Sequence, residues 1–208
     1  MINKSKSRDI KAIAKNSDTI EIFAKNYIHY LSERFSAIDF SKFEKLKNFI
    51  LKARNQKKTI FVFGNGGSAA TASTMANDLG FDILKKTSTD KPFKFFALTD
   101  NTPVITAIAN DTGYENLLIN QLKIHFAKGD SVILISASGN SKNLIIAAKW
   151  IKKNGGCIFS LLGFDGGKLK KLSNEYILVK SSKGDYGPVE DAHLIINHIL
   201  AHWFQNKL

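Results

Sequence analysis

The chain has 208 residues, with 30 Lys and Arg against 18 Asp and Glu, which leaves a formal net charge of +12. Hydrophobic residues make up 44% and charged residues 23%, an ordinary globular composition that excludes a disordered or collagen-like chain. Only three of the 30 cations are arginines, and the lysines occur in scattered pairs, so we expect a lysine-rich surface and no nucleic-acid partner.

The first 16 residues are polar and rich in lysine, and we expect them to fray. They lack the apolar core of a signal peptide, and no apolar run reaches the roughly 20 residues that a membrane span needs. We therefore expect a cytoplasmic protein with no membrane partner. The single cysteine, Cys157, excludes an internal disulfide, and its apolar neighbours predict a small core residue.

Two amphipathic helices are predicted before the first strand. Apolar residues recur every three or four positions from Ile20 to Phe35, and a second such pattern runs from Phe43 to Ala53. The two patterns predict an N-terminal helical hairpin within residues 1–56, packed on the rest of the chain or on another subunit. Its large apolar surface favours a homo-oligomer.

Residues 57–208 alternate strands with helices. Nearly continuous apolar runs predict five strands that are buried on both faces, at 59–63, 93–98, 131–135, 157–162 and 176–179. Helical segments are predicted between and after them, near 67–80, 102–126, 141–154, 165–172 and 188–205. This order predicts a five-stranded parallel sheet flanked by helices, a flavodoxin-like α/β fold, and a single domain over residues 1–208.

The candidate site lies in the loops that follow the strands, because ligands of open parallel sheets bind beyond the carboxyl ends of the strands. GNGGS (64–68) follows the first strand, and SASGNS (136–141) follows the third, directly before a helix. Serine hydroxyls and helix N-terminal amides can cradle a phosphate, although a serine-capped helix after a glycine turn would use the same residues. Neither loop matches a P-loop or a GxGxxG fingerprint, so no nucleotide cofactor is predicted.

Six ordered motifs resemble the SIS (sugar isomerase) domain family and, within it, the phosphoheptose isomerase group. They are GNGGSA at 64–69, ALTDN at 97–101, TAIANDTGYE at 106–115, ISASGNS at 135–141, DGGKL at 165–169 and VEDAHLIINHIL at 189–200. The resemblance implies an aldose–ketose isomerase that converts sedoheptulose 7-phosphate to D-glycero-D-manno-heptose 7-phosphate by moving a proton between C1 and C2. It also implies a homotetramer whose sites lie between subunits.

The resemblance also implies roles for individual residues. Asp78 would be the base and His198 the acid of the proton transfer. The serines of the third loop would hold the phosphate. The implied substrate-binding residues are Asn65, Gly66, Gly67, Ser68, Asn110, Asp111, Ser136, Ala137, Ser138, Ser141 and Glu190.

The sequence departs from the family at the zinc site, where the family has His and Glu on the helix after GNGGS and Gln and His on the last helix. Thr74, Asp78, Glu190 and His198 stand at these four positions, and threonine is a poor zinc ligand. Asp78, Glu190 and His198 could still hold a divalent cation with water, and this set would suit a harder ion about as well as zinc. Ala137 also removes one hydroxyl from the serine loop.

Simpler structural explanations exist for the catalytic candidates. Asp78 could face solvent near a helix end, Glu190 could complement a helix dipole in a first turn, and His193 could be a core residue or support Glu190. Three functions therefore stay open: a phosphoheptose isomerase, an isomerase of a different ketose phosphate, or a non-catalytic SIS-type regulator that binds a sugar phosphate. The altered residues at the zinc site motivate the last two.

Overall fold

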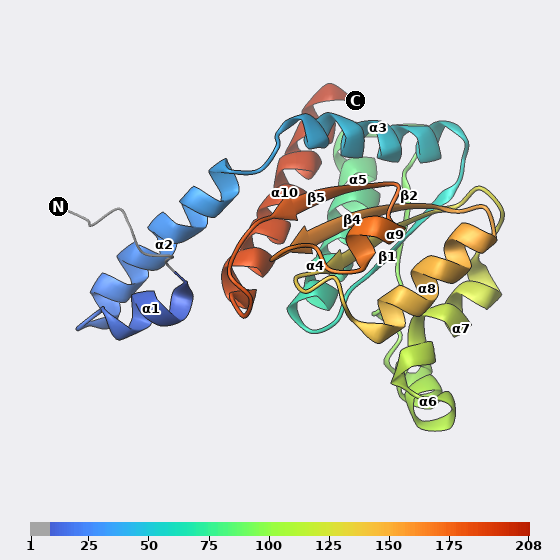
Figure 1. Ribbon diagram of the computed structural model, residues 1–208. Helices are drawn as coiled ribbons and strands as arrows, with labels where there is room; N and C mark the ends of the chain where they lie inside the picture. Colours follow the sequence, from blue (N-terminus) through green and yellow to red (C-terminus); the bar gives the residue numbers. More distant parts are fainter. Residues whose placement is uncertain (1–8) are drawn as a thin grey trace.

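The computed structural model describes residues 9–208 (Figure 1). Three helices precede the sheet: α1 (Ile10–Lys15), α2 (Ile20–Ser36) and α3 (Ser41–Asn55). The prediction that residues 1–16 fray is wrong from Ile10 onward, because the Asp9 carboxylate accepts the Ala12 amide at 2.6 Å and caps α1. Residues 1–8 of that prediction lie outside the described part of the chain.

A five-stranded sheet forms the centre of the fold, in the order β2-β1-β3-β4-β5. All neighbouring strands are parallel, so the predicted flavodoxin-like α/β fold is confirmed. Each strand lies within one residue of its predicted bounds. The strands are β1 (Thr59–Phe63), β2 (Lys94–Ala97), β3 (Ser131–Ser136), β4 (Cys157–Gly163) and β5 (Glu175–Val179).

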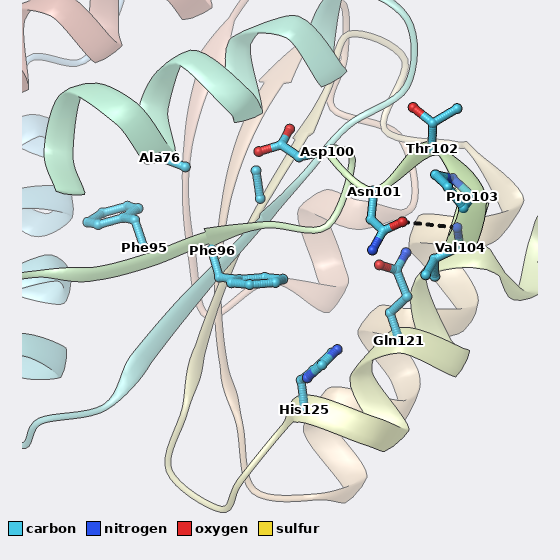
Figure 2. Close-up of a pocket in the computed structure, with 11 residues that line it drawn as sticks. Ala76, Phe95, Phe96, Asp100, Asn101, Thr102, Pro103, Val104, Gln121 and His125 are labelled. Atoms are coloured by element: carbon cyan, nitrogen blue, oxygen red, sulfur yellow. Dashed lines mark hydrogen bonds between the residues drawn. The ribbon is translucent and has the colours of Figure 1, made fainter. Parts of the chain in front are cut away.

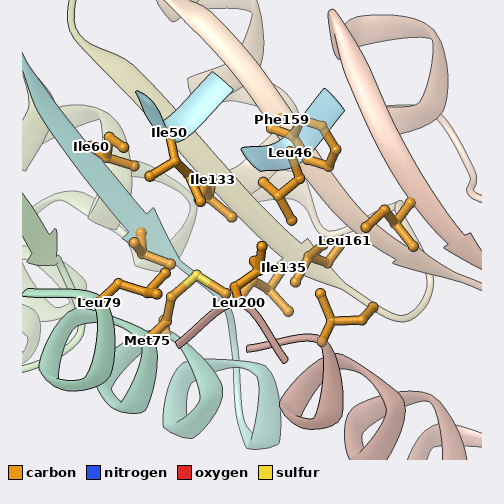
Figure 3. Close-up of a cluster of buried hydrophobic side chains, with 14 of the residues drawn as sticks. Leu46, Ile50, Ile60, Met75, Leu79, Ile133, Ile135, Phe159, Leu161 and Leu200 are labelled. Atoms are coloured by element: carbon orange, nitrogen blue, oxygen red, sulfur yellow. The ribbon is translucent and has the colours of Figure 1, made fainter. Parts of the chain in front are cut away.

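Helices cover both faces of the sheet because alternate strand residues point to opposite sides. On one face, Ile133 and Ile135 of β3 pack with Met75 and Leu200 from the helices, and with Ile50 of α3 (Figure 3). The other face is covered by α7 (Leu117–His125) and α8 (Lys142–Lys153). The helices of this part are α4 (Gly67–Ala76), α5 (Ile83–Thr87), α6 (Thr102–Thr112), α7 (Leu117–His125), α8 (Lys142–Lys153), α9 (Leu169–Leu172) and α10 (Tyr186–Lys207).

The helix after β1 continues beyond its predicted end at residue 80. A π-helical segment, Asn77–Asp82, joins α4 to α5. The helix continues because Leu79 and Ile83 are fully buried against the core. Such π-helical turns are rare and occur often at functional sites, and this one contains Asp78.

Cys157 is exposed, so the prediction that it is a core residue is wrong. It is the first residue of β4, and the buried part of the strand begins only at Ile158. The apolar run therefore indicated the strand correctly but not the burial of its first residue.

Helices α1 and α2 extend to one side of the sheet, with α2 packed on α10 (Figure 1). The buried Asp185 carboxylate anchors them, because it accepts the Ile10 amide at 3.1 Å and the Tyr30 hydroxyl. The exposed fractions of Ile20 and Ile28 are 80% and 63%, so part of the apolar face of α2 lacks a partner within residues 9–208. None of the helices in that range is long and apolar enough to cross a membrane.

Candidate active site

The GNGGS turn lies between β1 and α4, at the carboxyl edge of the sheet. Gly66 has φ +57° and ψ −126°, a conformation that costs glycine little and other residues much. No side chain caps the start of α4 at Gly67. The amides of Ser68 and Ala69 instead donate to the carbonyls of Asn65 and Gly66, at 3.1 and 2.9 Å, which closes the turn tightly.

A hydrogen-bond network connects this turn to two other loops. The Asn65 side-chain oxygen accepts hydrogen bonds from the Asn143 amide and the Tyr114 hydroxyl, both at 2.9 Å. Asn143 is buried at the start of α8, directly after the serine loop. Tyr114 and Asn143 were not predicted as site residues, although Tyr114 lies inside the motif at 106–115 and Asn143 lies two residues after the motif at 135–141.

The serine loop curls over the start of α8. The hydroxyl oxygens of Ser136 and Ser138 accept the amides of Gly139 and Asn140 at 3.1 and 3.2 Å. Each hydroxyl proton is thus free to be donated to a ligand. Ser141 precedes α8 and makes no capping hydrogen bond. These features favour the phosphate cradle over a serine-capped helix.

The DGG segment holds the serine loop in place. Gly139 has φ +61°, and a Cβ atom there would lie 2.0 Å from the Gly166 carbonyl oxygen, so only glycine fits. The Lys168 amide donates to the Asn140 side chain at 3.1 Å, and the Leu169 amide donates to the Gly139 carbonyl at 3.0 Å.

Asn110 and Asp111 lie at the C-terminal end of α6, where both side chains are exposed and bond to each other at 2.8 Å. The structure places the residues just after them closer to the other loops. Tyr114 contacts Asn65, and the Glu115 carboxylate pairs at 3.0 Å with Lys142, the first residue of α8. The implied role of Asn110 and Asp111 in substrate binding stays a prediction.

Glu190 of α10 lies over the GNGGS turn. A Cβ atom on Gly67 would come within 2.2 Å of the Glu190 Oε2 atom. Burial raises the pKa of the Glu190 carboxyl, and the nearby Asp191 charge raises it further. The first-turn explanation for Glu190 is wrong, because α10 begins at Tyr186 and has no acidic residue in its first turn.

Asp78 and His198, the implied base and acid, lie next to each other. The His198 Nε2 atom is 3.8 Å from the Asp78 Oδ2 atom. Asp78 is 16% exposed and His198 is 51% exposed, so the imidazole faces solvent while the carboxylate lies beneath it. The solvent-facing interpretation of Asp78 is therefore wrong.

Glu190 and the Asp78–His198 pair lie at two separate positions along the line where α4 and its continuation face α10, which we call the seam. Glu190 meets Gly67 at one position, and His198 meets Asp78 at the other. The eight residues from Glu190 to His198 correspond to about 12 Å of helix. The glycine and serine loops thus lie at one end of the seam, and the acid–base pair lies more than two turns further on.

The ligand set of the family's zinc site is not assembled in this arrangement. The Thr74 hydroxyl donates back to the Ala70 carbonyl at 3.0 Å, and the Glu190 carboxylate is directed at Gly67. Among residues 9–208, no three His, Cys, Asp or Glu side chains are grouped to hold a metal ion. Because the residues present do not fit the zinc site, no step of the mechanism below passes through a metal.

His193 is fully buried one turn after Glu190, but its Nε2–H donates to the Leu162 carbonyl of β4 at 3.2 Å. Burial lowers the pKa of its imidazole to about 4, so it is neutral at pH 7. These observations favour the interpretation of His193 as a core residue over the interpretation that it supports Glu190.

A separate hollow of about 500 Å³ lies between the edge strand β2 and helices α6 and α7. Figure 2 shows Asp100, Gln121 and His125 around it, with the Phe96 ring at its side. None of the residues implied for the sugar site lines this hollow. It is therefore distinct from the seam between α4 and α10.

Comparison with known proteins identifies the family of this chain. Residues 25–163 match the family model of the SIS domain. The chain is 38% identical over 149 residues to a phosphoheptose isomerase of Leptospira biflexa, an alignment that covers 72% of this chain and 75% of that protein. It is 39% identical over 157 residues to the phosphoheptose isomerase of Sulfurimonas denitrificans, an alignment that covers 74% of this chain and 76% of that protein.

Solved structures show the same fold. A phosphoheptose isomerase from Neisseria gonorrhoeae superposes with a TM-score of 0.77 at 24% identity, covering 89% of this chain and 96% of that chain. A phosphoheptose isomerase from Francisella tularensis superposes with a TM-score of 0.76 at 21% identity, covering 91% of this chain and 98% of that chain. The fold and its loops define a SIS domain protein. Within that family, the chain belongs to the phosphoheptose isomerase group.

Proposed function

We propose that this protein is a phosphoheptose isomerase that converts sedoheptulose 7-phosphate to D-glycero-D-manno-heptose 7-phosphate. The observation that carries the proposal is the seam between α4 and α10. A glycine turn and a serine loop meet at one end of it, and the Asp78–His198 pair lies at the other. The identity to phosphoheptose isomerases over about three quarters of the chain supports the same reaction.

The serine loop would bind the phosphate. Ser136, Ser138 and Ser141 can each donate a hydroxyl proton, and the start of α8 adds uncapped amides and its dipole. Asn65 and the GNGGS turn would then contact the sugar hydroxyls beside the phosphate. Glu190, held against Gly67, would accept hydrogen bonds from the same part of the sugar.

From the phosphate, the sugar chain would extend along the seam toward Asp78. The offset of about 12 Å between Glu190 and His198 favours a long, extended sugar phosphate over a short one. This length supports a heptose phosphate over shorter ketose phosphates. The Glu190 carboxylate, where the family has an amide, is the feature that favours the alternative substrate.

The proton transfer follows from the arrangement of the pair. The Asp78 carboxylate takes a proton from C1 of the ketose while His198 donates a proton to the C2 oxygen, which yields an enediol. His198 then takes the proton of the C1 hydroxyl, and Asp78 returns its proton to C2. This sequence gives the aldose and restores both side chains.

We further propose that the chain is a single SIS domain, with residues 1–56 as N-terminal helices and 57–208 as the α/β core. We propose a homotetramer, supported by exposed apolar side chains on α2 and by Trp203 on α10, which is 47% exposed. A mass of about 23.1 kDa in solution, that of one chain, would reject this assembly. The cytoplasmic location also stays a prediction, which cell fractionation tests.

Incubation with sedoheptulose 7-phosphate and detection of an aldoheptose phosphate tests the function directly. A panel of ketose 6-phosphates and 5-phosphates run beside it tests the alternative substrate. Faster turnover of one of these would replace the heptose proposal. Binding of sugar phosphates without turnover of any would instead support the non-catalytic regulator, which the contact between Asp78 and His198 disfavours.

A further inference from the structure

Asn197 of α10 is a buried side chain that the proposed reaction does not yet use. Its exposed fraction is 0%, and its Nδ2 donates to the Asp78 Oδ2 atom at 2.7 Å. Its own Oδ1 is buried and finds no hydrogen-bond partner in the described part of the chain. A buried amide with an unpaired oxygen is unfavourable for packing alone, and the hydrogen bond to Asp78 is the one that its side chain makes in the described part of the chain.

The chemistry of the two groups sets the orientation of this amide. An ionised carboxylate only accepts hydrogen bonds, so Asn197 must turn its NH₂ toward Asp78. From the other side, the side-chain NH₂ group of Asn77 donates to the Asp78 Oδ1 atom at 3.0 Å. Neutral donors thus hold both oxygens of Asp78, one from its own helix and one from α10.

His198 reaches the same carboxylate from the exposed side. Its Nε2 lies 3.8 Å from the Asp78 Oδ2 atom, too far for a direct hydrogen bond. Asn197 therefore holds the carboxylate from beneath, and the imidazole stays free to move protons to and from the sugar oxygens.

We propose that Asn197 is a positioning residue, which orients the Asp78 carboxylate so that it can move the proton between C1 and C2. The proposal rests on the proposed function, because it needs Asp78 to act as the base. Asp78 is one methylene shorter than the glutamate that the family resemblance implies here. The amide of Asn197 ties this shorter side chain to α10.

The first experiment measures turnover of sedoheptulose 7-phosphate by Asn197→Leu, which keeps the size of the side chain and removes the donor. We expect kcat to fall about tenfold to a hundredfold because the base loses its alignment, while KM changes less than about threefold. Gln121→Leu is the matched control. Its amide is also buried and donates to the Leu98 and Leu117 carbonyls, away from the seam.

The second experiment does not depend on activity. Urea unfolding midpoints are measured for Asp78→Ala, Asn197→Ala and the double variant, and we expect the two shifts to be clearly non-additive because the partners are in contact. If the wild type turns over no sugar phosphate, the proposed function fails, whereas this cycle still reports on the contact. If Asn197→Leu does not fold, Asn197→Ser, which is too short to reach Asp78, replaces it.

Four results would overturn the proposal: a wild-type kcat in the Asn197 variant, a change in KM alone, an equal loss of kcat in Gln121→Leu, or additive shifts of the unfolding midpoint.

Discussion

The carboxylate of Glu190 rests on the α-carbon of Gly67, so closely that a Cβ atom there would lie 2.2 Å from Oε2. This contact places the last helix directly on the first loop of the site, although the two residues are far apart in the sequence. A larger residue at position 67 would displace the end of the Glu190 side chain, although φ there is not positive and no backbone strain is involved.

Gly67→Ala should therefore push Glu190 off the turn. We expect a change of less than about 1 kcal/mol in the free energy of unfolding, because the flexible Glu190 side chain can move aside, but a higher KM for the sugar phosphate. Chemical denaturation and steady-state kinetics measure the two effects. The control is Gly80→Ala, where the nearest atom, Phe95 Cβ, is 3.8 Å away. Equal behaviour of the two variants would contradict the contact.

Glu190→Gln should change how stability depends on pH. The raised pKa of this carboxyl means that the folded state favours the protonated form, so ionisation costs stability as the pH rises through the folded pKa. We expect the variant to melt at a higher temperature than the wild type at pH 7, and the difference to disappear near pH 4. Thermal melts across this range measure it, and a larger difference at pH 4 than at pH 7 would refute the assignment.

Asp78→Asn and His198→Ala should remove turnover but not binding. We expect kcat to fall by about 10²–10⁴, the usual contribution of general acid–base groups, with affinity for the sugar phosphate nearly unchanged. Kinetics and calorimetric titration separate the two quantities. His202→Ala, an exposed histidine one turn further along α10, is the control. Full activity in Asp78→Asn would show that another group takes the proton.

Ser141→Ala should weaken phosphate binding. A hydrogen bond to a charged group contributes about 2 kcal/mol, so we expect KM to rise tenfold or more and inhibition by inorganic phosphate to weaken in parallel. Ser160→Ala, which removes a buried hydroxyl bonded to Ser173, is the control and should leave KM unchanged. If KM rises but phosphate inhibition does not weaken, Ser141 acts elsewhere on the sugar.

Removal of divalent metals should leave activity largely intact, because Thr74 and Glu190 do not complete a ligand set with Asp78 and His198. Activity before and after treatment with a chelator, with metal content measured on the same sample, tests this. Activity that is lost on chelation and restored by zinc would support the metal site instead. Thr74→His, which adds an imidazole one turn before Asp78, should increase zinc binding.

The sheet and the loops at its carboxyl edge could be predicted from the sequence, because they depend on local patterns. Five apolar runs of strand length indicated β1 to β5, and the parallel order then placed GNGGS and the serine loop at the same edge. Such patterns indicate that a segment is buried but not where the burial begins. Cys157, the first residue of its apolar run, is therefore exposed although burial was predicted. Gly80 does not end its helix, because the packing of Leu79 and Ile83 outweighs the weak helix propensity of glycine.

The contacts inside the site were decided only by the tertiary structure. Family resemblance brought Asp78, Glu190 and His198 to attention together, but in the structure His198 lies beside Asp78, whereas the Glu190 carboxylate lies against Gly67. The same packing brings Asn197 to Asp78 across 119 residues of sequence. No local pattern encodes such a pair, because it depends on how far one helix is shifted along another, and the shift is set by the packing of both helices on the same sheet.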